Sequence, residues 1–86
     1  MDKLEDWRNR IDLLDEILIE TISKRMDISR QIGRYKAEHG IDILQPERYR
    51  RMMISRHAEA DRLGLQSDFI DRLFDLIHEE SRRQQG

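Results

Sequence analysis

The chain has 86 residues, which is enough for one domain but too short to bury a large core on its own. Its net charge of −2 argues against a dedicated nucleic-acid binder. The chain has no cysteine, which excludes disulfides and thiolate metal sites and suits a reducing cytoplasm. No apolar run approaches the ~20 residues of a membrane span, and the acidic start MDKLEDW is unlike a signal peptide. We therefore expect one cytoplasmic domain over residues 1–86, stabilised by oligomerisation.

A long helix is predicted from about Lys3 to Glu38, because its apolar residues recur with a heptad spacing. The a and d positions are held by two series, Leu4, Ile11, Leu18, Arg25 and Ile32, and Trp7, Leu14, Thr21, Ile28 and Tyr35. No proline interrupts the segment, and Gly40 is a plausible stop. This periodicity favours an ordered chain, although a charged fraction of 40% by itself borders on disorder.

Two shorter helices are predicted after a connector over residues 41–44. Gln45-Pro46 opens the first of them, since proline suits the first helical position, and Leu63-Gly64-Leu65 closes it. Ser67 is expected to cap the next helix, with Asp68 in its first turn. The buried stripe of that helix and its polar continuation are Ile70, Leu73, Phe74, Ile77, Ser81, Gln84 and Gln85. The fold class is therefore all-α, with one long helix and two shorter ones.

The predicted long helix exceeds what the rest of the chain can cover. At 1.5 Å per residue it would span ~54 Å. A compact globule of this size has a radius of gyration of only ~12 Å. The heptad face needs another copy of the chain, so we expect an intertwined helical dimer.

Three cations lie on or beside the predicted apolar seam of the long helix. Arg25 occupies an a position, where an unpaired charge would need an anion from a neighbour or a ligand. Arg8 and Lys36 flank the seam, and for either one alone a solvated rim position is an equally good interpretation. Arg8 and Arg25 are ~25 Å apart along the axis, so one site can use both only if Arg8 comes from the other copy. Arg25 and Lys36, ~16 Å apart, could converge.

The polar end of the last helix could face these cations. Ser81 and Gln85 would add hydroxyl and amide donors to a cationic pocket, which fits a small dianion. Other candidates are weaker, because the three histidines lack metal-ligand spacing and no catalytic triad can be read. Arg48, Arg50 and Arg51 form a short basic patch typical of a solvated helix face. We expect no metal, cofactor, nucleic acid or membrane partner.

Five groups of residues, spread over nearly the whole chain, share their order and spacing with a known family. They are Trp7-Arg8-Asn9-Arg10-Ile11-Asp12 with Leu14-Asp15, Arg25-Met26, Ile32-Gly33-Arg34-Tyr35-Lys36, Gln45-Pro46-Glu47-Arg48, and Ile77-His78-Glu79-Glu80-Ser81 with Gln85. In combination they resemble the all-helical (type II) chorismate mutases. The resemblance implies a homodimer of three-helix chains with two equivalent sites, which rearrange chorismate to prephenate in aromatic amino-acid biosynthesis.

The resemblance also implies a role for each site residue. Arg25 would hold a carboxylate of the substrate, and Arg8 would enter the site of the partner subunit to hold it as well. Lys36 and Gln85 would form hydrogen bonds to the ether oxygen, whose bond to carbon breaks in the reaction. Ser81 would help with a carboxylate.

Arg48 matches a family arginine close to the site. Two positions near it depart from the family pattern. Many members have acidic residues where Gln45 and Tyr49 stand, and those side chains meet the ring hydroxyl of chorismate. Glutamine can still donate and accept there, and tyrosine offers its phenol. The departures open a related alternative, isochorismate-pyruvate lyase, whose members also lack some of these carboxylates. A catalytically weak regulatory or interaction module of the same fold is a further alternative.

The implied reaction suits the residues that the chain offers. A pericyclic rearrangement needs no nucleophile, metal or proton relay. It needs the substrate held in its reactive shape, and positive charge where the breaking ether oxygen becomes negative. A site of arginine, lysine, glutamine and serine supplies both.

Overall fold

The computed structural model describes residues 2–86 and contains three helices within them. α1 spans Lys3–His39, α2 spans Pro46–Arg62 and α3 spans Ser67–Gln85. The predicted all-α class is confirmed, and the first helix ends one residue beyond its predicted end. None of these helices is long and apolar enough to cross a membrane.

The ends of α1 and α2 follow the chemistry of helix caps. The Asp2 carboxylate accepts a hydrogen bond from the Leu4 amide at 3.0 Å and caps the start of α1. Gly40 ends α1 with a φ of +63°, and Gly64 follows α2 with a φ of +75°. L-amino acids with a side chain rarely adopt this left-handed conformation, so glycine is required at both turns. Pro46 is the first residue of α2, as predicted.

The expected cap of α3 is wrong by one residue. Gln66 is the N-cap, with extended backbone, and its carbonyl accepts the first helical hydrogen bond from the Ile70 amide at 3.1 Å. Ser67 is instead the first helical residue and makes no side-chain capping bond. The extended backbone of Gln66, with a φ of −73° and a ψ of 138°, ends directly before Ser67, so the helix begins one residue earlier than the preference for a serine cap suggests.

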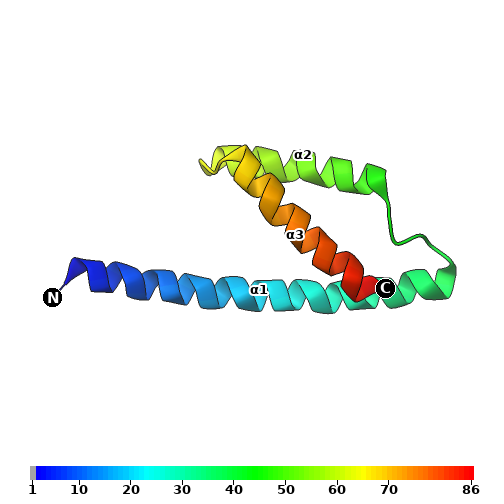
Figure 1. Ribbon diagram of the computed structural model, residues 1–86, viewed down its shortest axis with the longest axis horizontal. Coiled ribbons are helices and arrows are strands. Elements are labelled where there is room, and N and C mark those ends of the chain that lie inside the picture. The colour runs from blue at the N-terminus through cyan, green and yellow to red at the C-terminus, as the bar shows by residue number, and fades with distance from the viewer. Residues whose placement is uncertain (1) are drawn as a thin grey trace.

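The three helices are arranged around α3 (Figure 1). α2 runs back along α1 at a distance from it, and α3 crosses the space between them to end beside the C-terminal half of α1. α3 accordingly packs against both α1 and α2. The chain is elongated, with extents of 58 × 24 × 15 Å and a radius of gyration of 16.4 Å, compared with ~12 Å for a compact globule of this length.

The N-terminal half of α1 extends away from the other helices and is exposed throughout (Figure 1). Its heptad residues Leu4, Trp7, Ile11, Leu14 and Leu18 are 48–63% exposed. The buried hydrophobic residues of the described chain are confined to Met26, Met52, Ala60 and Ile70. An apolar face this long, beside so small a core, is typical of a surface that another protein covers.

Gly33 lets the end of α3 approach α1 closely. A Cβ atom at Gly33 would lie 2.5 Å from both the Cα and the carbonyl oxygen of Gln85. These are backbone atoms, so they cannot move aside as a flexible side chain could. The absence of a side chain at Gly33 therefore sets the distance between the two helices and places Gln85 against α1.

Gly33→Ala is expected to destabilise the protein. An alanine in a helix is otherwise more stable than a glycine by about 1 kcal/mol. Here the added methyl group forces α3 away from α1, and such overpacking costs about 1–3 kcal/mol. Denaturant unfolding at a fixed protein concentration measures the difference in the free energy of unfolding. Arg34→Gly, at the exposed next position, gives the helix-propensity effect alone; a Gly33→Ala protein that gains about 1 kcal/mol would contradict the close approach.

Candidate active site

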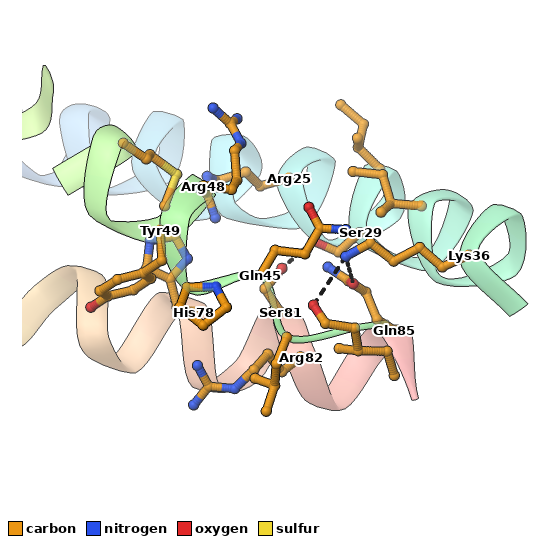
Figure 2. A pocket seen from close by; sticks show the side chains of 16 residues that line it. Arg25, Ser29, Lys36, Gln45, Arg48, Tyr49, His78, Ser81, Arg82 and Gln85 are labelled. Carbon is orange, nitrogen blue, oxygen red and sulfur yellow. Dashed lines mark hydrogen bonds between the residues drawn. The ribbon is translucent and has the colours of Figure 1, made fainter. Parts of the chain in front are cut away.

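A cavity of about 580 Å³ opens where α1, the connector after it, the start of α2 and the end of α3 meet (Figure 2). Its lining residues are Arg25, Ile28, Ser29, Ile32, Lys36, Ile43, Leu44, Gln45, Pro46, Arg48, Tyr49, Met52, His78, Ser81, Arg82 and Gln85. Every site residue that the sequence suggested, with the exception of Arg8, therefore lines this one cavity. Elements far apart in the sequence build it, and its size suits a small metabolite.

Lys36 holds three elements together at one end of the cavity. Its ammonium group donates to Oε1 of Gln85 at 3.0 Å and to the backbone carbonyl of Ile43 at 3.1 Å. Lys36 belongs to α1, Gln85 ends α3 and Ile43 lies in the connector. An ammonium group has three protons to donate, so one remains for a ligand. The two fixed partners orient Lys36 before any ligand arrives.

A pair of buried hydroxyl groups lies beside this end. Ser29 of α1 and Ser81 of α3 are 5% and 8% exposed and share a hydrogen bond between their Oγ atoms. Ser81 was a predicted site residue, whereas Ser29 was not. The pair ties the two helices together, and the second lone pair or proton of Ser81 is available to the cavity.

Arg25 is a partly buried cation without a carboxylate partner in the described chain. Its guanidinium carbon lies 6.0 Å from the centre of the Phe74 ring, and Arg56 lies on the same ring at 5.8 Å. Burial, and then the nearby charge of Arg56, lower the pKa of Arg25. An arginine remains protonated even so. The place beside Arg25 therefore favours an anion.

The opposite end of the cavity is formed by Tyr49 and His78 (Figure 2). The Tyr49 hydroxyl donates to a carboxylate oxygen of Asp75 at 2.5 Å, and this bond is the main cause that raises the pKa of Tyr49. The rings of Tyr49 and His78 meet edge to face, with centroids 4.9 Å apart. Gln45 caps α2 through its backbone, and its side-chain amide donates to the Asp42 carbonyl at 3.4 Å.

Arg8 does not reach the cavity of its own chain. It lies on the exposed N-terminal half of α1, ~25 Å along the helix axis from Arg25. The geometry of one chain therefore does not bring the two arginines together. A shared site would need the Arg8 side chain to enter from a second copy.

Sequence reasoning missed three polar residues that line the cavity, Ser29, His78 and Arg82. His78 and Arg82 lie four residues apart on α3, so they share one face of the helix, and His78 is also three residues before Ser81. That spacing was the available signal. It was masked because a lone histidine and a terminal arginine pair have ordinary structural explanations.

Comparison with known proteins adds a family to this geometry. The model of the family described as "Chorismate mutase type II" matches residues 7–86. The T-protein of Haemophilus influenzae is 37% identical over 81 residues, 94% of this chain. The 4-amino-4-deoxychorismate mutase of Streptomyces venezuelae is 33% identical over 94% of this chain and 79% of its own length. The isochorismate pyruvate lyase of Pseudomonas aeruginosa is 34% identical over 87% of this chain and 74% of its own length.

The coverage of these relatives differs. The chain spans only about a fifth of the two T-proteins that it matches, 22% and 21% of their lengths. It spans most of the shorter relatives. The family match over nearly every residue, on a three-helix chain whose cavity gathers the matching residues, leads to one conclusion. The chain belongs to the type II chorismate mutase family.

Proposed function

We propose that this chain is a chorismate mutase, an isomerase that converts chorismate to prephenate in aromatic amino-acid biosynthesis in the cytoplasm. The observation that carries the proposal is the Lys36–Gln85 pair, held at one end of a cavity that also contains the unpaired Arg25. Incubation of the purified protein with chorismate should yield prephenate. A folded protein that leaves chorismate unchanged would favour the regulatory or interaction module instead.

The geometry fits the demands of a pericyclic reaction. Chorismate is a dianion, and Arg25 and Arg48 offer it positive charge from α1 and α2. Binding both carboxylates holds the enolpyruvyl side chain over the ring, which provides the orientation that the rearrangement needs. In this proposal, the third proton of Lys36 and the amide group of Gln85 donate to the ether oxygen. Because negative charge grows on that oxygen in the transition state, these donors stabilise the transition state more than the substrate.

Lys36→Ala should reduce turnover of chorismate about a hundred- to a thousandfold, since loss of one preorganised donor to a developing oxyanion costs about 3 kcal/mol. The Michaelis constant should change much less. Lys36→Arg should recover little, because a planar guanidinium does not replace a compact ammonium held by two partners. The initial rate of prephenate formation measures both variants.

The matched control is Lys24→Ala, which removes an exposed lysine of the same helix that does not line the cavity. It should keep the wild-type rate. Helicity and molecular mass in solution must be unchanged in all three variants for the comparison to count. A Lys36→Ala protein with wild-type turnover would show that Lys36 is not the ether-oxygen donor.

We further propose a homodimer in which Arg8 enters the cavity of the partner subunit. Two observations support it: the exposed heptad face of α1, and the distance of Arg8 from its own cavity. Sedimentation at low micromolar concentration should give twice the mass of one chain.

A mixture of Arg8→Ala and Arg25→Ala chains should recover activity after joint refolding, although each variant alone is inactive. Half of the dimers in an equal mixture are hybrids, and each hybrid has one site that keeps both arginines, so about a quarter of wild-type sites should return. Prephenate formation measures the recovery. Mixtures that form dimers but stay inactive would rule out the contribution of Arg8 across the interface.

The residues expected to meet the ring hydroxyl of the substrate are those that differ from the family pattern. Gln45 is neutral, and the Tyr49 phenol already donates to Asp75. We therefore propose that hydroxyl recognition is weak and that isochorismate, with pyruvate and salicylate as products, is the alternative substrate. 4-Amino-4-deoxychorismate, which appears in the name of a relative, should be tested as a substrate beside chorismate and isochorismate.

Gln45→Asp and Tyr49→Glu should change the Michaelis constant for chorismate only modestly. One neutral hydrogen bond contributes about 0.5–1.5 kcal/mol, or about two- to tenfold in binding. Steady-state kinetics give the value, with Gln66→Asp, outside the cavity, as the control. A loss of turnover as large as that of Lys36→Ala would instead make these two residues central to the reaction.

A further inference from the structure

His78 is an ionisable side chain that the proposed function leaves without a role. It lies on α3 one turn before Ser81, is 9% exposed and lines the cavity (Figure 2). Its Nε2 atom is buried and has no hydrogen-bond partner in residues 2–86. A buried polar nitrogen without a partner is unfavourable. Its presence beside a ligand-sized cavity therefore calls for a partner that the chain itself does not supply.

The surroundings of His78 carry an excess of positive charge. Each helix contributes one guanidinium group, Arg25 from α1, Arg56 from α2 and Arg82 from α3. Burial lowers the pKa of His78 most, followed by these three arginines, so the imidazole is neutral at pH 7. Asp75 acts weakly in the opposite direction, and it is already bonded to the uncharged Tyr49 phenol.

None of the three arginines has a carboxylate within 4.0 Å in the part of the chain that the structure describes. The cluster therefore attracts an anion rather than an uncharged group such as a hydroxyl. An anion beside Arg25 would also lie near the imidazole, and an opposite charge at short range favours the protonated form of histidine.

We propose that His78 is a further substrate-binding residue, whose protonated form binds one carboxylate of the substrate together with Arg25. The inference rests on the proposed function, because it takes the dianionic substrate as the source of the carboxylate. On binding, the neutral imidazole takes up one proton from solvent and becomes an imidazolium, with a proton on each ring nitrogen. Because Nε2 is buried in the free protein, the imidazole ring turns toward the cavity as Nε2 donates to a carboxylate oxygen. No bond to carbon forms or breaks in this step.

Proton uptake makes binding depend on pH in a defined direction. Binding raises the pKa of His78 from its lowered value in the free protein, so affinity should fall as pH rises through the interval between the two values. Each unit by which binding raises the pKa corresponds to about a tenfold change in affinity. The free protein should also lose stability as pH falls below about 6.5, because the unfolded chain takes up a proton that buried His78 resists.

Titration calorimetry with prephenate, in two buffers of different ionisation enthalpy, tests the proposal by counting protons. The wild-type protein should take up as much as one proton per site near pH 7, and its affinity should fall as the pH rises above the lowered pKa of His78 in the free protein. His78→Gln keeps an N–H donor near the place of Nε2 but does not titrate. It should bind several-fold more weakly at pH 6, take up no proton and show no pH dependence. His39→Gln, an exposed histidine outside the cavity, should behave like the wild type.

Three outcomes would overturn the proposal. The first is the absence of proton uptake by the wild-type protein, and the second is equal proton uptake by the wild type and His78→Gln. The third is an NMR titration in which prephenate does not raise the pKa of His78. The last measurement uses the wild-type protein, so it decides the question even if His78→Gln does not fold. If the wild-type protein turns over chorismate but takes up no proton on binding prephenate, this inference is contradicted and the proposed function is not affected. Failure to turn over chorismate or bind prephenate would sink both.

Discussion

A helix of 37 residues is about 55 Å long, and helices of 17 and 19 residues cannot cover it. The rest of the structure follows from this mismatch. α2 and α3 gather at the C-terminal half of α1 and form the cavity there, whereas the apolar residues of the N-terminal half stay exposed. A chain with this shape buries too few apolar side chains to be stable alone. In the homodimer proposed above, the stability of the chain and the completion of its site depend on the same event, the binding of a second copy.

Within one chain, the position of the site depends on how closely α3 approaches α1. The contact of Gly33 with the backbone of Gln85 fixes that distance. The Ser29–Ser81 hydrogen bond and the Lys36–Gln85 hydrogen bond lie on either side of the contact along α1. Side chains that could serve a ligand thus also hold the helices together. This sharing keeps the donors oriented without a ligand, but it uses part of their hydrogen-bonding capacity on the protein itself.

The local features of the fold could be predicted because they depend on residues that are close together in the sequence. Heptad spacing, a proline at a helix start and glycines at helix ends gave α1 and α2 nearly to the residue. The cap expected at Ser67 was wrong because the preference of one residue type does not fix where the backbone enters the helix. The position of Gln85 on the last helix suggested that it could face Lys36, and the family pattern paired the two at one ether oxygen. Periodicity alone could not have paired them across 49 residues. His78 escaped notice because its burial and charged surroundings arise only when three helices meet.

The cavity is lined by four cationic side chains, Arg25, Lys36, Arg48 and Arg82, and none of them has a carboxylate within 4.0 Å in the described residues. Arg25 is partly buried beside Arg56, and both lower the pKa of His78. Each cation would be more stable in water or beside a carboxylate, so the fold is less stable for keeping them there. Such a cost is common at sites where binding a charged ligand must be strong and well oriented. In the proposed rearrangement, which needs no proton relay or metal, the arrangement of fixed positive charge is the protein's main contribution. The same charge that destabilises the free chain is what would hold a dianion in its reactive shape.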